Sequence, residues 1–231
     1  MRVIPVESSL GPSRLVADGP LDAAHVLLLG HGAGDGIEAP DLELLARLLP
    51  PAGITVVRHE QPWRTAGKRV AAPPNRLDQA WREAVDVLRE ELAPESVLAV
   101  GGRSAGARVA CRTAVELGAA AVLALAFPLH PPGRPEASRA AELLGAGVPA
   151  LVLQGSKDTF SSAADVARMV ADEPAAGHRI RVVEVPGAGH PLTLPKRSAV
   201  STEDFWADQA TVVADFLRGA DTHRPAAARV E

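Results

Sequence analysis

The residues Gly102-Arg103-Ser104-Ala105-Gly106 stand out for their chemistry, because they match the pattern G-x-S-x-G. An apolar run over residues 97–100 precedes the pattern and an amphipathic stretch follows it, so the serine is expected at a sharp strand-to-helix turn. Such a turn projects the hydroxyl clear of the sheet, and the flanking glycines leave room for it. The pattern predicts that Ser104 is a nucleophile; the alternative is a tight turn without chemistry.

A serine nucleophile needs a base, and the base needs an acid that orients it. Asp158 and His190 follow two later apolar runs, in the chain order Ser, Asp, His. Parallel strands end at one edge of a sheet, so both side chains are expected beside Ser104. An alternative role for Asp158 is to cap a helix that begins near Ser161. His190 follows Gly-Ala-Gly, where a structural histidine has little to pack against.

Two backbone N–H groups are expected to stabilise a tetrahedral oxyanion at this serine. Ala105 follows the nucleophile and supplies one of them, and Ala33 in the H-G-x-G run over residues 31–34 supplies the other. A phosphate-binding glycine loop is the competing interpretation of this early run. It fails the pattern G-x-G-x-x-G, because Asp35 stands where the last glycine should fall.

Alternating apolar runs and amphipathic stretches must position these groups. Continuous apolar runs predict strands that are covered on both faces; they are residues 25–29, 54–57, 97–100, 121–126, 150–153 and 180–185, with a further edge strand at 2–6. Helical spacing of apolar residues occurs in 41–49, 77–92, 105–117, 137–144, 163–170 and 203–217. This alternation predicts an α/β fold, with a doubly wound, mostly parallel sheet and helices on both faces.

The units of strand and helix account for nearly the whole chain as a single domain, residues 1–219. Between residues 127 and 150, only a proline loop and one short helix fit, so no separate cap domain is expected. The segment 220–231 has no periodicity and is predicted to be a disordered tail.

Composition excludes several classes of protein. The 231 residues are 47% hydrophobic and 23% charged, which is typical of a globular domain with a substantial core. A net charge of −4 and only 3% aromatic residues argue against a nucleic-acid partner. One cysteine excludes an internal disulfide framework, and the histidines lack ligand spacing, so neither a metal nor a cofactor is expected. Without an apolar stretch of signal or membrane length, a cytoplasmic protein without a membrane partner is predicted.

These motifs together resemble the α/β-hydrolase superfamily, in particular its dienelactone-hydrolase-like branch and the small hydrolase-like proteins grouped with the KANL and Tex proteins of animals. The resemblance rests on residues 31–34, 60–63, 101–106, 127–133, 151–155 and 189–190. It implies the α/β-hydrolase fold and the triad. Dienelactone hydrolases proper carry cysteine where Ser104 stands, so their substrate is not implied. Some animal relatives are subunits of chromatin-modifying assemblies.

The same loops predict a substrate pocket. Trp63 and Phe127 are expected to wall an acyl site, and His31 and His130 to line it. The few large side chains predict a shallow, open site. Basic residues at 64, 68 and 69 either attract an anionic substrate or form a solvated loop, and Arg103 is expected to orient neighbouring loops.

The predicted function is that of a serine hydrolase that cleaves a carboxylic ester or thioester through an acyl-enzyme. Two alternatives stay open. One is a binding or scaffolding module on a hydrolase fold, and the other is an acyltransferase that uses the same triad. The oligomeric state is not predicted from the sequence.

Overall fold

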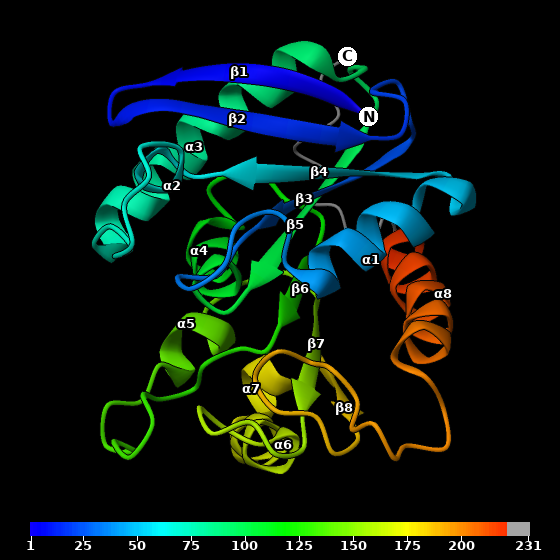
Figure 1. Ribbon diagram of the computed structural model, residues 1–231. Coiled ribbons are helices and arrows are strands. Elements are labelled where there is room, and N and C mark those ends of the chain that lie inside the picture. The colour runs from blue at the N-terminus through cyan, green and yellow to red at the C-terminus, as the bar shows by residue number, and fades with distance from the viewer. Residues whose placement is uncertain (221–231) are drawn as a thin grey trace.

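The computed structural model describes residues 1–220, so all but the first residue of the predicted tail, 220–231, lies outside the described residues. One eight-stranded sheet dominates this part, in the order β1-β2-β4-β3-β5-β6-β7-β8 (Figure 1). Its strands are β1 Arg2–Ser8, β2 Gly11–Asp18, β3 His25–Gly30, β4 Ile54–Glu60, β5 Val97–Arg103, β6 Val122–Leu125, β7 Ala150–Gly155 and β8 Ile180–Val185. β2 is antiparallel to both of its neighbours, β1 and β4. The strands β3 to β8 are all parallel to one another.

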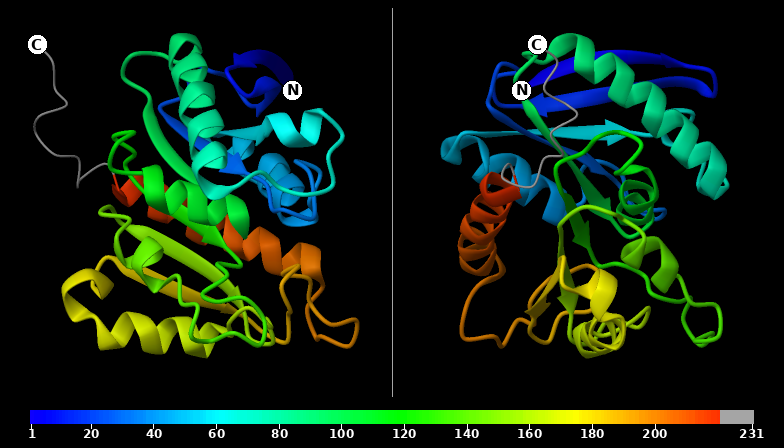
Figure 2. Two further views of the ribbon diagram at one scale, coloured as in Figure 1. Left: turned by 90° about the vertical axis from the view of Figure 1, so that its left-hand side faces the viewer. Right: turned by 180° about the vertical axis from the view of Figure 1, so that it is seen from behind.

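Helices cover both faces of this sheet. They are α1 Pro40–Leu48, α2 Pro62–Thr65, α3 Pro74–Glu91, α4 Ala105–Thr113, α5 Ala140–Leu144, α6 Ala163–Asp172, α7 Pro174–Gly177 and α8 Thr202–Ala220, with a 3-10 turn at Pro50–Ala52. Figures 1 and 2 show α1 and α8 side by side on one face, and α3 and α4 on the other. The predicted doubly wound α/β fold is thereby confirmed.

Each face of the sheet has its own hydrophobic core, because successive side chains of a strand point to opposite faces. On β3, Val26 and Leu28 join the core beneath α3 and α4. Leu27 and Leu29 join the core beneath α1 and α8. The continuous apolar run of this strand therefore reflects its burial on both sides.

Some elements differ from the sequence prediction. β2 was not expected, because Pro12, Arg14 and Asp18 interrupt its apolar pattern. It forms because it pairs with β1 in a tight hairpin, in which Ser8 lies opposite Gly11. α4 ends at Thr113 instead of continuing to Leu117, and α5 begins at Ala140 instead of Ala137. The short helices α2 and α7 were not expected either, and each begins at a proline.

The segment between β6 and β7 contains α5 and turns only, so within residues 1–220 no separate cap covers the end of the sheet. No helix of the described chain combines the length and the apolar character that crossing a membrane requires.

Candidate active site

Ser104 lies in the turn between β5 and α4, as the G-x-S-x-G pattern predicts. Its backbone has φ 53° and ψ −107°, a conformation that side-chain-bearing residues rarely adopt. The turn is held in place because the Ser104 N–H donates to the Leu125 carbonyl at 2.9 Å. On the other side, a Cβ built at Gly106 would overlap the backbone of Gly30, so the first turn of α4 touches the end of β3 directly.

The structure brings Ser104, Asp158 and His190 together in one hydrogen-bonded chain. The Nε2 atom of His190 lies 2.9 Å from the Ser104 Oγ. The Nδ1 atom of the same ring lies 2.8 Å from the Asp158 Oδ2. Because an ionised carboxylate only accepts hydrogen bonds, Nδ1 carries the proton and Nε2 offers its lone pair to the serine hydroxyl. This geometry allows the imidazole to take a proton from Ser104.

The loops that carry Asp158 and His190 are bonded to one another at the ends of β7 and β8. The Lys157 N–H donates to the Ala188 carbonyl at 2.9 Å, and the Gly187 N–H donates to the Ser156 Oγ at 2.8 Å. A side chain at Gly155 would strike the backbone of the β8 loop, so the two loops are packed as closely as backbones allow. This contact fixes the register between the acid and the imidazole.

Asp158 is buried and its carboxylate has further donors. Oδ1 accepts the Phe160 N–H at 2.9 Å, and Oδ2 accepts from the Gln154 Nε2 at 3.1 Å. The Phe160 ring also stacks near the imidazole of His190, with the ring centroids 4.3 Å apart. The helix-cap alternative for Asp158 is excluded, because α6 begins with a capping box formed by Ser162 and Asp165.

The loop after β3 carries the H-G-x-G run and lies against the serine turn. A Cβ built at Gly32 would lie 3.6 Å from the Ser104 Cβ. Ala33 is exposed in this loop. Ala105 is the first residue of α4, so its N–H has no carbonyl partner within the helix. Both predicted oxyanion donors are thus in segments that adjoin the serine.

His31 is buried and both its ring nitrogens bond to backbone. Its Nδ1 donates to the Gly32 carbonyl at 2.8 Å, and its Nε2 accepts the Gln61 N–H at 3.1 Å. Burial lowers the pKa of His31, so the ring is neutral, as these two bonds require. The structure therefore places His31 as a link between the loops after β3 and β4.

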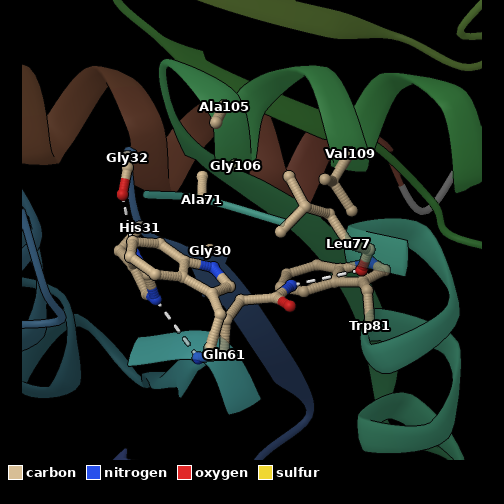
Figure 3. A pocket seen from close by; sticks show the side chains of 11 residues that line it. Gly30, His31, Gly32, Gln61, Ala71, Leu77, Trp81, Ala105, Gly106 and Val109 are labelled. Carbon is tan, nitrogen blue, oxygen red and sulfur yellow. Dashed lines mark hydrogen bonds between the residues drawn. The ribbon is translucent and has the colours of Figure 1, made fainter. Parts of the chain in front are cut away.

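A small cavity lies beside the first turn of α4. Figure 3 shows Ala105 and Gly106 on one side of it and His31, Gln61 and Trp81 across from them. Trp63, which was expected to wall an acyl site, also lines this cavity. The volume is about 10 Å³, which has room for about one water molecule.

The other predicted pocket residues lie elsewhere. Phe127 is fully buried in the core beneath α4, so it has no face open to a ligand. His130 is half-buried, and its Nδ1 lies 3.1 Å from the Pro131 carbonyl. Lys68 and Arg69 are exposed, whereas Arg64 is half-buried beside the loop after β3, where its Nε would lie 3.5 Å from a Cβ built at Gly36.

Three contributors to the site were not identified as such in the sequence. Gln154 supports Asp158, Phe160 stacks on His190, and Asp41 pairs with Arg103 from the first turn of α1. Gln154 has a weak signal, since a polar residue closes an otherwise apolar strand run. Asp41 was predicted to begin a helix, and nothing local in the sequence indicates that it is buried.

His59 on β4 lies fully buried below the site, and burial lowers its pKa to about 3. In the unfolded chain, a histidine binds a proton near pH 6.5, whereas buried His59 stays neutral at that pH. Below pH 6.5, proton binding at this residue therefore stabilises the unfolded chain relative to the folded one. We expect the fall in unfolding free energy between about pH 7.5 and about pH 5 to be about 2 kcal/mol larger in wild type than in His59→Gln. Urea unfolding at the two pH values measures this, and an equal fall in both proteins would contradict it.

No cluster of His, Cys, Asp and Glu side chains within residues 1–220 is arranged to hold a metal ion. The polar groups at the site are instead engaged with one another in the Ser104–His190–Asp158 chain. Such an arrangement can activate a hydroxyl by proton transfer.

Comparisons with known proteins agree with this architecture. Residues 23–218 match the family described as "Alpha/beta hydrolase domain". A lidless α/β serine hydrolase from Xanthomonas campestris shares the fold at 21% identity and a TM-score of 0.69, covering 94% of each chain. The esterase domain of a Rhodothermus marinus protein shares it at 17% identity and a TM-score of 0.68, covering 94% of this chain and 98% of that one. Curated protein sequences gave no match. Because the family match spans most of its length, this chain belongs to the alpha/beta hydrolase domain family.

Proposed function

We propose that the protein is a serine hydrolase that cleaves carboxylic esters or thioesters through an acyl-enzyme. One observation carries this proposal: the unbroken chain from the Ser104 Oγ to the His190 Nε2 at 2.9 Å, and from the His190 Nδ1 to the Asp158 Oδ2 at 2.8 Å. In these roles Ser104 is the nucleophile, His190 the general base and Asp158 the group that orients the imidazole.

In the first half-reaction, the His190 Nε2 takes the hydroxyl proton as the Ser104 Oγ bonds to the carbonyl carbon of the substrate. The carbonyl oxygen becomes an oxyanion that the N–H groups of Ala33 and Ala105 stabilise, helped by the N-terminus of α4. The intermediate then expels the alcohol or thiol, which receives the proton from Nε2, and the acyl group stays on Oγ. In the second half-reaction, water loses a proton to Nε2 as it attacks the acyl carbon. The bond from the acyl carbon to Oγ then breaks, the acid is released, and Nε2 returns the proton to the Ser104 Oγ.

The small cavity beside Ala105 does not favour a substrate with a large acyl group. The cavity beside Ala105 is about 10 Å³, and the buried ring of Trp63 forms part of its wall. No separate cap covers the site within residues 1–220, which favours an accessible substrate over an enclosed lipid. Among the predicted pocket residues, we propose that Trp63 contacts the substrate. We propose that His31 holds together the loops after β3 and β4.

We also propose the branch of the α/β-hydrolase superfamily to which the chain belongs. The motif at residues 127–133 supports membership of the dienelactone-hydrolase-like branch, and the esterase neighbours in fold support ester chemistry. The proposed mechanism requires no cofactor, and we propose that the protein acts in the cytoplasm.

A fluorophosphonate probe tests this function. We expect it to label wild type at Ser104, as a mass shift on the peptide that contains this residue, because only an activated serine reacts. Labelling should fail in Ser104→Ala and be slowed in Asp158→Asn. Turnover is then measured on esters and thioesters of increasing acyl length, with and without an acceptor alcohol or amine.

Each outcome of that experiment decides between the candidate functions. Labelling with turnover that is independent of the acceptor supports a hydrolase, whereas a product formed on the acceptor indicates an acyltransferase. No labelling and no turnover across the series would overturn the proposal and favour a binding module.

A further inference from the structure

Arg103, the residue directly before Ser104, is buried and contacts three separate segments. Its Nη2 donates to the backbone carbonyl of His190 at 3.2 Å. Its Nε lies 3.1 Å from the Asp41 Oδ2 at the start of α1, and its Nη1 bonds to Asp35 in the loop after β3. Only 7% of its side chain is exposed. The guanidinium thus links the end of β5 to three segments. They are the loop after β3 that carries Ala33, here named the oxyanion loop, the start of α1, and the loop that carries His190.

The loop that carries His190 depends on contacts of this kind. No helix or strand lies between the end of β8 at Val185 and the start of α8 at Thr202. Within this segment, Leu192 adopts φ 54°, a strained conformation that persists only where surrounding contacts impose it. Asp158 and Phe160 contact the imidazole ring of His190, whereas Arg103 bonds to the backbone carbonyl of His190.

The charge at Arg103 is matched by the carboxylates around it. Asp41 has 1% of its side chain exposed, and burial raises its pKa to about 6 while Arg103 opposes that rise. Asp35 is half-exposed at the other side of the guanidinium. A planar guanidinium directs its N–H groups outward in a fixed fork. Arg103 can therefore donate to Asp35 and to the His190 carbonyl while it forms an ion pair with Asp41, a geometry that a lysine ammonium on a flexible stem cannot match.

We propose that Arg103 is a positioning residue, which holds the His190 backbone and the oxyanion loop in the arrangement that aims the imidazole at Ser104. This inference rests on the proposed function, since it concerns the same site. The competing explanation is that Arg103 only neutralises Asp41 and stabilises the fold. The two differ in what the loss of Arg103 does to the imidazole.

The test compares Arg103→Met and Arg103→Lys with the control Arg112→Met. Arg112 lies on α4 and pairs with Asp78 and Glu142, so its loss also removes a partly buried ion pair but touches no triad loop. We expect Arg103→Met to lower kcat for ester hydrolysis about 100-fold and to leave KM within about 3-fold of the wild-type value. Arg103→Lys should recover part of the lost kcat. Arg112→Met should keep kcat within about 3-fold of wild type.

A second readout does not depend on turnover. The proton on the His190 Nδ1, held by Asp158, gives a low-field resonance in the proton NMR spectrum of wild type that His190→Gln removes. We expect this resonance to shift or broaden in Arg103→Met and to be unchanged in Arg112→Met. Circular dichroism establishes that each variant is folded, and if Arg103→Met does not fold, Arg103→Lys and Asp35→Asn take its place in both measurements.

The two proposals fail in different ways. If wild type neither reacts with the fluorophosphonate nor turns over any ester, the proposed function is wrong, while the resonance still reports on positioning. If wild type is active but the folded Arg103 variants keep both kcat and the resonance, Arg103 serves only the fold and the positioning role is overturned.

Discussion

Replacing Ser104 with alanine is expected to lower kcat for ester hydrolysis by about 10⁵- to 10⁶-fold, because the nucleophile that forms the proposed acyl-enzyme is removed. The fold should persist, since the Ser104 N–H, not its hydroxyl, holds the turn to Leu125. Alanine has no more difficulty than serine with φ 53° at this position. Initial rates with a chromogenic ester measure the change, and Ser138→Ala, an exposed serine in the loop after β6, is the matched control.

The other two triad residues predict a specific pattern of non-additivity. His190→Ala should cost about as much as Ser104→Ala, and the double variant should be no slower than either, because the groups act as a unit. Asp158→Asn should cost about 10⁴-fold, since an amide can donate to Nδ1 and so favour the wrong tautomer of the imidazole. Effects of the single variants that multiply in the double variant, or turnover in Ser104→Ala close to that of the Ser138→Ala control, would exclude this mechanism.

The strands that precede Ser104 and Asp158, β5 and β7, could be predicted from sequence because each is buried on both faces. Such strands appear as continuous apolar runs, as β3, β5 and β7 do, whereas the edge strand β8 exposes Arg181 and Glu184. The parallel arrangement then places Ser104, Asp158 and His190 at one edge without further information. β2 was missed for the opposite reason: its stability comes from pairing with β1 and β4, which a local pattern does not report.

The contacts around the triad could be predicted only in part. Arg103 was expected to orient loops, yet its partners Asp35, Asp41 and the His190 carbonyl come from three distant segments. His31 was expected to line a pocket, and it does line the small cavity beside α4, but its two backbone hydrogen bonds also make it a link between loops. Polar side chains in loops take their roles from tertiary contacts, so their type and position alone leave several roles open.

The structure shows which atoms the glycines of the G-x-S-x-G motif leave room for. A Cβ built at Gly106 would overlap the carbonyl group of Gly30 and would lie 3.0 Å from its Cα. The obstructing atoms are backbone, which cannot rotate away as a side chain can. α4 therefore packs on the end of β3 only because residue 106 lacks a side chain, and this contact places the oxyanion loop beside Ser104.

Gly106→Ala is accordingly expected to destabilise the folded state by about 3 kcal/mol or more, although alanine favours helices, because the steric overlap outweighs helix propensity. Urea unfolding measures the change. Gly34→Ala is the matched control, since a Cβ at Gly34 meets no atom within 4 Å and its φ is not in the left-handed region. It should change the unfolding free energy by less than about 1 kcal/mol. If both variants are equally stable, β3 and α4 can separate at little cost, and the close backbone contact is not what fixes the oxyanion loop.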